Sequence, residues 1–250
     1  MRRIGLAVLA VIACGGCTHG LDAVAADPAA TLATTGGPSR SMIYARRTPA
    51  GVILVDLGWF DARAALRRRL ASIGARPEDV VAVLVTHSHR DHVGGWRAVR
   101  GARFFAADGE LELLHGRSEH GGWLARWGDR LWRPDLPEAG EIRVRTFASD
   151  TVLTFGWDTV HAFPVPGHTA GSAAYLIDGV LFLGDGLSHS RVFGGFRPPV
   201  GRYSEDPLRA RRSLISVLRR ARPLGVETVC TAHANCAPFD DTFLLDVSEP

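Results

Sequence analysis

Three histidines and one aspartate fall within six residues of this chain, in the segment THSHRDH at 86–92, which the residues VGG follow. Imidazole nitrogens and carboxylate oxygens are the protein ligands of zinc and of other divalent transition metals. The density of these groups is too high for histidines that only satisfy hydrogen bonds in a core. The segment therefore predicts a metal site, with His87, His89, Asp91 and His92 as candidate ligands.

Three further candidate ligands follow, each where a predicted strand runs into a loop. His168 lies in the glycine-flanked segment PGHTAGS, Asp185 ends the apolar run LFLGD, and His233 follows the last predicted strand. The run VVAVLV at 80–85, directly before the first motif, is continuously apolar and predicts a strand buried on both faces. One rim of a sheet could therefore gather all of these side chains.

The types and order of these residues resemble the metallo-β-lactamase fold superfamily, over about residues 42–239. The resemblance implies an α/β fold, a four-layer αββα sandwich with a binuclear metal site along one edge. It also implies a place for each candidate: His87, His89 and His168 on the first metal, Asp91, His92 and His233 on the second, and Asp185 bridging both. Asp56, at the end of the predicted strand GVILVDLG, would support the site without binding metal.

The ligand set favours two zinc ions, with iron or manganese as alternatives, because it contains imidazoles and carboxylates and has no thiolate at the bridging position. An aspartate at position 185 makes the pattern closer to the glyoxalase II-like and lactonase-like hydrolases than to β-lactamases with cysteine or serine there. The expected reaction is hydrolysis of an ester, thioester or lactone in a small-molecule substrate. A hydroxide held by both metals would attack the carbonyl carbon, and Asp91 would carry a proton to the leaving group.

Three other functions stay open. The first is β-lactam hydrolysis, which suits an exported protein but is disfavoured by Asp185. The second is a mononuclear iron dioxygenase acting on sulfur compounds through His87, His168 and Asp185, and the third is a metal-bound lipoprotein without catalysis. Two details bear on the substrate of the hydrolase. Ser188 stands where lactonases of this fold often carry tyrosine, which counts against a lactone substrate. The 17 residues after His233 are too few for a helical region that binds glutathione, which disfavours a glyoxalase II.

Hydrophobic patterning predicts the elements that must position these residues. Strands are expected at 51–58, 80–85, 142–147, 151–155, 159–163, 173–177, 180–183 and 226–231. One helix is expected from Asp61 to Gly74, with Leu66, Leu70 and Ile73 on its inner face. A longer helix is expected over about 204–222, with Leu208, Leu214, Ile215 and Leu218 facing inward.

Two segments and one cysteine pair each admit two interpretations. The segment 115–137 holds three tryptophans, and a surface helix with the tryptophans buried in the core is favoured over a lid or wall above the site. The segment GGFRPP at 194–199 is either a plain loop or the opposite rim. Cys230 and Cys236 are either buried free thiols, the favoured interpretation, or a disulfide formed after export.

The amino terminus is typical of an exported protein. Met1-Arg2-Arg3 and the apolar run 4–13 have the layout of a secretory signal, and the residues VIAC at 11–14 resemble a bacterial lipobox that would make Cys14 the lipidation site. Cys17 or simple signal cleavage are the alternatives. The expected organisation is a signal at 1–17, a tether at 18–41 and a catalytic domain at 42–250, located in the periplasm or cell envelope and held to the membrane only by lipid.

Composition excludes a multipass membrane protein and argues against a nucleic-acid-binding protein. The 250 residues are 46% hydrophobic and 22% charged, as in an average soluble domain, and no later run approaches the roughly 18 apolar residues of a spanning helix. All 29 basic residues are arginine, against 26 acidic residues, and removal of residues 1–13 lowers the net charge from +3 to +1. A nucleic-acid partner is therefore not expected, because it requires a strong positive field. Oligomeric state stays open.

Overall fold

The computed structural model describes residues 41–59, 63–131, 133–189, 195–199, 201–233, 236–241, 243 and 247, with the backbone alone at 30–35 and at 189. The predicted signal at 1–17, with the lipidation candidate Cys14, lies outside the described residues. Within the described part, no helix is both long and apolar enough to cross a membrane.

Six strands form the first sheet, in the order β1-β2-β3-β4-β5-β6. Their bounds are β1 (Ala30–Thr35), β2 (Ser41–Thr48), β3 (Gly51–Val55), β4 (Val80–Leu84), β5 (Arg103–Ala107) and β6 (Arg143–Phe147). The pairs β1/β2 and β2/β3 are antiparallel, whereas β3, β4, β5 and β6 run parallel to one another. Parallel neighbours need a crossover connection, which helix α2 (Arg63–Ser72) supplies between β3 and β4.

Six more strands form the second sheet, in the order β14-β13-β10-β9-β8-β7. Their bounds are β7 (Thr151–Phe155), β8 (Asp158–Pro164), β9 (Ala173–Ile177), β10 (Val180–Phe182), β13 (Thr228–Cys230) and β14 (Cys236–Pro238). All neighbours are antiparallel except β10 and β13, between which helix α6 (Pro207–Ala221) intervenes in the chain. A small ribbon of β11 (Ser188–His189) and β12 (Phe196–Arg197) completes the strands of the described part.

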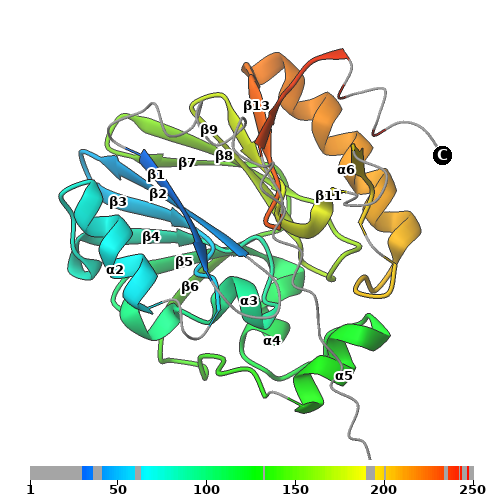
Figure 1. The fold of residues 1–250 in the computed structure, drawn as a ribbon, viewed down its shortest axis with the longest axis horizontal. Coiled ribbons are helices and arrows are strands. Elements are labelled where there is room, and N and C mark those ends of the chain that lie inside the picture. The colour runs from blue at the N-terminus through cyan, green and yellow to red at the C-terminus, as the bar shows by residue number, and fades with distance from the viewer. Residues whose placement is uncertain are drawn as a thin grey trace, which may run out of the picture.

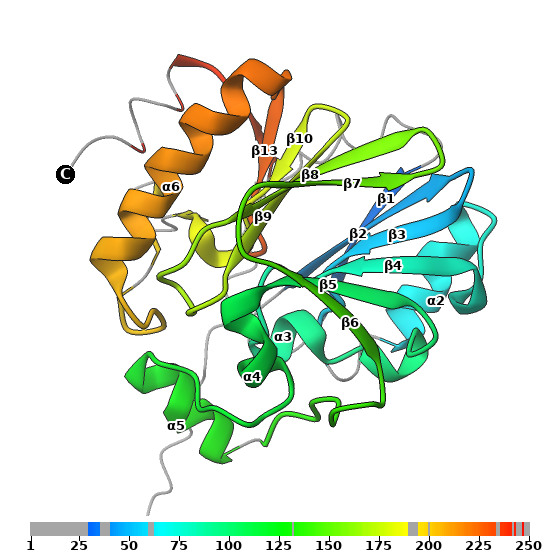
Figure 2. The same cartoon turned by 180° about the vertical axis from the view of Figure 1, so that it is seen from behind.

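The two sheets face each other, with helices on both outer sides (Figures 1 and 2). α2, α3 (Arg90–Val93), α4 (Leu111–Leu114) and α5 (Trp123–Leu131) lie on the side of the first sheet, and α6 covers the second. Short 3-10 turns lie at η1 (Pro77–Asp79), η2 (Trp96–Ala98), η3 (Asp108–Glu110), η4 (Gly184–Gly186) and η5 (Arg222–Leu224). The predicted four-layer αββα sandwich is confirmed.

Three hydrophobic clusters separate the four layers, and β3 shows how one strand serves two of them. Ile53 and Val55 belong to the cluster between the sheets, whereas Val52 and Leu54 pack in the cluster that holds α2. Successive side chains of a strand point to opposite faces, so a strand covered on both sides must be apolar throughout. The continuous run GVILV follows from this position.

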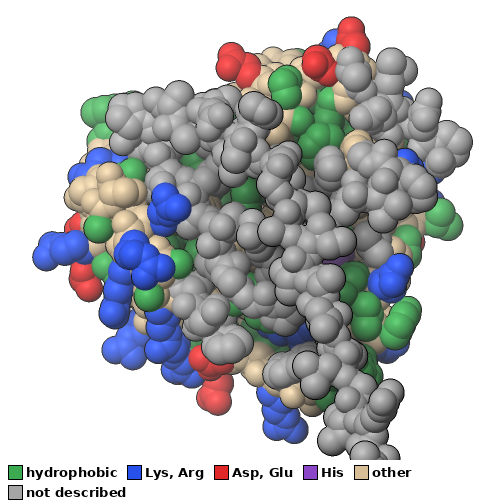
Figure 3. All heavy atoms as spheres, in the orientation of Figure 1, with side chains coloured by type: hydrophobic (Ala, Val, Ile, Leu, Met, Phe, Trp, Pro, Cys, Tyr) green, Lys and Arg blue, Asp and Glu red, His purple; other side chains and the backbone are tan. Residues whose placement is uncertain are grey.

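Helix α2 is apolar on one side only. Leu66 and Leu70 are buried, and Gly74, with a φ of +65°, follows the end of the helix in a conformation that glycine adopts without strain. The outer side carries exposed Arg67, Arg68 and Arg69, and basic side chains gather over this part of the molecule in Figure 3. The predicted helix over this segment is confirmed from Arg63 onward, while its expected start at Asp61 lies outside the described residues.

Two features of the elements differ from the sequence-based expectations. β1 lies within the segment 18–41, which the sequence suggested as a tether, and it pairs with β2 in the first sheet. Leu208 was expected to face inward but is 71% exposed, because the buried side of α6 runs through Ala210 and Leu214 and Leu208 lies two helical positions from Ala210. The helix begins at Pro207, where the side chain of Asp206 accepts a hydrogen bond from the Arg209 amide. Leu214 and Leu218 are buried as expected, and Ile215 is half-buried.

Trp123 and Trp127 of the segment 115–137 are not in the core. Trp123 is 63% exposed and Trp127 is 56% exposed, both on the outer side of α5, while Trp132 lies outside the described residues. The buried positions of this helix are instead Ala125 and Gly128. Gly128 packs closely against the guanidinium of Arg90, which leaves no room for a large side chain on that face. The predicted surface helix in this segment is confirmed, whereas the predicted burial of Trp123 and Trp127 is wrong.

Cys230 and Cys236 form a disulfide, so the favoured interpretation of free thiols is also wrong. The two residues are directly opposite each other on the antiparallel strands β13 and β14. The bond closes the short loop that contains His233, the last candidate ligand.

Tyr175, on β9 of the second sheet, makes a polar contact with the first sheet. Its side chain is fully buried, and its hydroxyl lies 2.9 Å from the Val85 carbonyl oxygen and 3.0 Å from the Phe105 carbonyl oxygen. Burial raises the pKa of this hydroxyl well above its ordinary value, so it remains a hydrogen-bond donor. The contact fixes the position of the two sheets relative to each other at Val85, two residues before His87.

Replacement of Tyr175 by phenylalanine is expected to lower the free energy of unfolding by about 1–2 kcal/mol, because buried carbonyl oxygens lose a donor while the ring stays in place. Urea unfolding followed by circular dichroism measures this, with a chelator present so that metal binding adds no stability. Tyr203→Phe is the matched control at a residue that is 42% exposed, with an expected change within about 0.5 kcal/mol. Equal stabilities of the two variants would contradict the inter-sheet role of Tyr175.

Candidate metal centre

The seven candidate ligands come from segments that follow strands of both sheets. His87, His89, Asp91 and His92 follow β4, and Asp91 and His92 lie in α3. His168 lies between β8 and β9, Asp185 lies in η4 after β10, and His233 follows β13. These strand ends meet at one edge of the sandwich. A backbone hydrogen bond of 2.9 Å from Met42 to Ala232 and another of 2.7 Å from Ala173 to Thr86 join the two sheets there.

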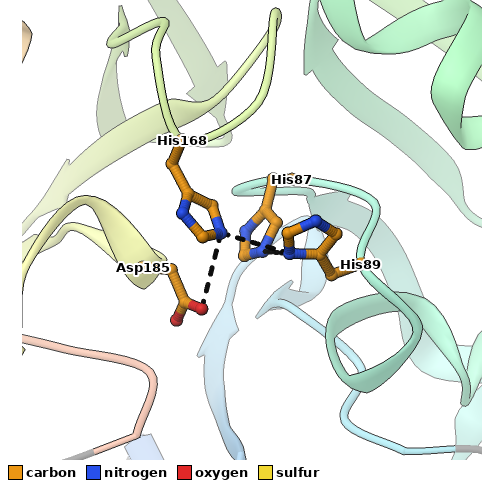
Figure 4. A group of neighbouring side chains, drawn as sticks. All are labelled: His87, His89, His168 and Asp185. Carbon is orange, nitrogen blue, oxygen red and sulfur yellow. Dashed lines mark hydrogen bonds and ion pairs between the residues drawn. The ribbon is translucent and has the colours of Figure 1, made fainter. Parts of the chain in front are cut away.

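The first group of side chains consists of His87, His89, His168 and Asp185 (Figure 4). Nδ1 of His89 lies 3.0 Å from Nε2 of His87 and 3.1 Å from Nε2 of His168. Asp185 approaches from the other side, with Oδ2 at 3.5 Å from Nε2 of His168. All three imidazoles are buried. Their ring nitrogens therefore converge on one point, which Figure 4 shows from the side chains themselves.

The second group consists of Asp91, His92 and His233. Nε2 of His233 lies 3.3 Å from Oδ2 of Asp91, and Nε2 of His92 lies 3.9 Å from the same oxygen. Oδ1 of Asp185 faces this group, at 3.1 Å from Nε2 of His233 and 3.6 Å from Nε2 of His92. Asp185 thus presents one carboxylate oxygen to each group, as a bridging ligand must.

A glycine lets Asp185 come this close to the first motif. Gly184 has a φ of +53°, and a Cβ atom on it would lie 2.6 Å from Oγ1 of Thr86. A larger residue would be strained in this conformation and would also push the loop away from Thr86. The glycine before the aspartate is therefore part of what positions the bridge.

Asp56 contacts both His92 of the second group and Thr86, the residue before His87. Its Oδ2 accepts a hydrogen bond of 2.7 Å from the Thr86 hydroxyl and lies 2.8 Å from Nδ1 of His92, while its Oδ1 accepts one of 2.8 Å from the Thr86 amide. Asp56 also has a φ of +55°, a conformation that costs energy outside glycine. The arrangement leaves Nε2 of His92 pointing toward Asp91 and Asp185, and a contact of this kind orients an imidazole.

The remaining ring nitrogens of the first group also have partners. Nδ1 of His168 lies 3.1 Å from the Ser204 hydroxyl, and Nδ1 of His87 lies 3.2 Å from the Thr86 hydroxyl. Such contacts fix the tautomer and the ring orientation of a metal-binding imidazole.

The two groups differ in charge. Burial lowers the pKa of His87 and of His89 well below the ordinary value, with neighbouring histidines adding to the effect, and it lowers the pKa of His168 to about 4. These imidazoles are neutral at pH 7, the form that binds metal. Burial also disfavours the cation at His92, but Asp56, Asp91 and Asp185 outweigh it and raise the pKa of His92 to about 9. Burial would raise the pKa of Asp185, yet His233 and His92 hold it well below its usual range.

The residues fit metal ions. Nδ1 of His89 is in contact with two other imidazole nitrogens, and neutral rings cannot supply a proton for every such contact. Nε2 of His89 and Nε2 of His92 are buried and form no hydrogen bond within the described part of the chain. Buried polar atoms of this kind are costly unless something satisfies them. A cation in each group would do so, and ligands of nitrogen and oxygen are those that zinc, iron and manganese accept.

All seven side chains predicted from the sequence as ligands lie within the two groups, and Asp56 lies against them. Two buried polar residues that sequence analysis did not assign to the site also contact it. The ring of His120 lies 4.5 Å from that of His89, measured between centroids, and Glu110 accepts hydrogen bonds from residues next to the first group. An acidic residue directly after the apolar run RFFAA, which forms β5, is the signal that could have drawn attention to Glu110.

Comparison with known proteins identifies the family and the fold of this chain. Residues 34–233 match the family model of the Metallo-beta-lactamase superfamily. A hydroxyacylglutathione hydrolase of Anaeromyxobacter dehalogenans is 35% identical over 187 residues, which cover 74% of this chain and 58% of that protein. One from a Shewanella species is 34% identical over 116 residues, covering 45% of this chain and 38% of that protein. The chain thus spans between about two fifths and three fifths of these relatives.

Solved structures show the same fold. The B3 metallo-beta-lactamase BLEG-1 matches with a TM-score of 0.62 and 23% identity, covering 84% of this chain and 93% of that one. A metallo-beta-lactamase family protein from Thermus thermophilus matches with a TM-score of 0.58 and 25% identity, covering 85% of this chain and 75% of that one. Fold and site define a protein of αββα architecture with two groups of candidate metal ligands at one edge. The chain belongs to the metallo-beta-lactamase superfamily.

The charge difference between the groups predicts two different pH profiles for metal binding. His92 carries a proton below about pH 9 in the metal-free site, and a metal must displace it, so affinity of the second group is expected to fall about tenfold per pH unit from pH 9 to pH 6. Affinity of the first group is expected to stay constant until the pH approaches 4, where His168 takes up a proton.

Competition of zinc with a chromophoric chelator at several pH values measures both affinities. The Asp56→Asn variant tests the cause, because loss of that charge lowers the pKa of His92 and should make the steeper of the two profiles shallower. Two zinc affinities that change in parallel with pH would contradict the assignment of charge to the second group.

Proposed function

We propose that this protein is a hydrolase that uses two metal ions, with zinc the favoured metal, to cleave an ester, thioester or lactone bond in a small molecule. The observation that carries the proposal is the position of Asp185, whose two carboxylate oxygens face two separate groups of histidines. One group alone would suffice for a single metal, and the second group would have no use.

Two metal ions held by these seven residues would supply a water activated near neutral pH and a Lewis acid for a carbonyl oxygen. The chain itself supplies orientation and a place for the proton. Asp56 holds the His92 ring, and Ser204 and Thr86 hold the rings of His168 and His87. Asp91, beside His233, is the carboxylate placed to hold a proton and pass it to the leaving group.

The substrate approaches from the side of the second group. The His233 side chain is 32% exposed and those of Asp185 and Asp91 are 18% and 13% exposed, whereas His87, His89 and His92 are buried. A bond to be cleaved is therefore expected to lie next to Asp91 and Asp185. This is where the carboxylates can serve both the carbonyl and the leaving group.

The named relatives support an acyl substrate, because hydroxyacylglutathione hydrolases act on a thioester of glutathione by their name. The proposal extends to thioester chemistry without the glutathione moiety. β-Lactam hydrolysis is the alternative reaction, and the same assays compare it with ester, thioester and lactone hydrolysis. Oxygen consumption by a protein that binds one iron ion would contradict the proposed hydrolase and favour the dioxygenase.

The zinc-loaded protein is expected to hydrolyse at least one member of a panel of small esters, thioesters and lactones faster than a β-lactam. Asp91→Asn is expected to lower kcat on that substrate by about 100-fold or more, because a positioned acid or base contributes roughly 10²–10⁴ to the rate. Asp135→Asn is the matched control, since Asp135 only pairs with Arg97 on the surface and its loss should change kcat less than about twofold.

Metal content of each variant, measured on the same samples, separates the two roles of Asp91. Loss of kcat with both metals retained supports the proton-carrying role, and loss together with one metal supports the ligand role. Absence of hydrolysis across the panel, or full activity of Asp91→Asn, would overturn the proposed reaction.

A further inference from the structure

Glu110 is a fully buried acidic residue that neither metal group uses. It ends η3, directly after β5, and its exposed fraction is 0%. Burial of a carboxyl group is costly unless donors surround it, and here burial raises the pKa of Glu110 while hydrogen bonds from Ser88 and Thr169 oppose the rise. A residue with this cost calls for a function that an apolar residue could not perform.

Three hydrogen bonds of 2.6 Å connect Glu110 with the loops that carry the first group. The Ser88 amide and the Ser88 hydroxyl both donate to Oε1, and the Thr169 hydroxyl donates to Oε2. Ser88 lies between His87 and His89, and Thr169 follows His168. One carboxyl group therefore holds the residues adjacent to all three histidines of the first group.

The backbone around Glu110 is built for close approach to the His168 loop. A Cβ atom on Gly171 would lie 1.9 Å from the Glu110 amide nitrogen, and one on Gly109 would lie 2.6 Å from the Ala170 carbonyl oxygen. Glycine at both positions lets the two loops pack backbone against backbone. This close packing brings the Glu110 carboxyl group within hydrogen-bond distance of the Thr169 hydroxyl.

The network continues behind Ser88. Its hydroxyl lies 3.0 Å from Nε2 of His120, whose Nδ1 lies 3.0 Å from Oδ2 of Asp129 on α5. Asp129 also pairs with Arg90, the residue between His89 and Asp91. The first motif is thus held from two sides, by Glu110 in η3 and by Asp129 in α5.

We propose that Glu110 is a positioning residue that sets the metal affinity of the first histidine group, by fixing the His87–His89 loop and the His168 loop relative to each other. The three histidines come from two sheets, and the strand contacts at Ala173 and Tyr175 follow His168 by at least five residues, so the distance between His168 and His89 is left to be fixed within the loops. Glu110 fixes it through hydrogen bonds to both loops. The proposal rests on metal binding by the first group, the binding part of the proposed function, and is independent of the reaction.

The test measures zinc affinity where only the first group can bind tightly. His233→Ala removes a ligand of the second group alone, and chelator competition then reports the affinity of the first group. In this background Glu110→Gln is expected to weaken zinc binding about 10-fold to 100-fold, the usual effect of losing a partner that orients ligands. The matched control is Glu112→Gln, two residues along the chain and exposed, with an expected change below about twofold.

A second pair of variants keeps the test decisive if Glu110→Gln folds poorly. Thr169→Val keeps the shape of the side chain but removes its hydrogen bond to Glu110, and Thr169→Ser keeps that hydrogen bond. Weaker zinc binding in Thr169→Val with recovery in Thr169→Ser supports the proposal. Unchanged zinc affinity in both Glu110→Gln and Thr169→Val, even with a lower Tm of the metal-free protein, would assign Glu110 a structural role only and overturn it.

Failure of this inference is distinguishable from failure of the proposed function. If the His233→Ala protein with Glu110 intact binds no zinc, metal binding by the first group is refuted, and with it the basis of the inference. If it binds zinc and the Glu110 variants bind equally well, only the positioning role is refuted. A lack of hydrolysis by the wild-type protein bears on neither outcome.

Discussion

Asp185 presents one carboxylate oxygen to each of two histidine groups, and the arrangement of the other ligands depends on this shared contact. Oδ2 lies 3.5 Å from His168 of the first group, and Oδ1 lies 3.1 Å from His233 of the second. Its negative charge also compensates the positive charge that His92 carries in the metal-free site. Without this carboxylate, the first group would be three neutral imidazoles, and the second group of Asp91, His92 and His233 would share no ligand with it.

The αββα sandwich makes the shared contact possible because strands of both sheets end at the same edge. β4 brings the first motif to this edge from one sheet, and the loops after β8, β10 and β13 bring His168, Asp185 and His233 from the other. Tyr175 holds the sheets in register through the Val85 and Phe105 carbonyl oxygens. Two buried carboxyl groups then hold the ligands that the strands bring to this edge. Asp56 contacts His92 of the second group, and Glu110 accepts a hydrogen bond from Ser88, between His87 and His89 of the first.

The sequence predicted the strands and the candidate ligands from local rules, whereas the four-layer arrangement came from the resemblance to the superfamily. Strands covered on both faces must be apolar throughout, as 51–55 and 80–84 are, and the first motif directly follows the second of these runs. Features that depend on distant partners were missed. Trp123 and Trp127 are exposed because Ala125 and Gly128 form the inner side of α5, where Gly128 packs against Arg90, and no periodicity within the segment reveals that contact. The Cys230–Cys236 bond requires knowledge that β14 returns opposite β13.

The number of metal ions per chain tests the central claim most directly. Titration of the metal-free protein with zinc, followed by elemental analysis after removal of unbound metal, should give two equivalents per chain in the wild type. Asp185→Asn should retain fewer than two, because both groups lose a charged ligand at once. One equivalent in the wild type, unchanged in Asp185→Asn, would contradict the account of Asp185 as a bridge between two metal sites.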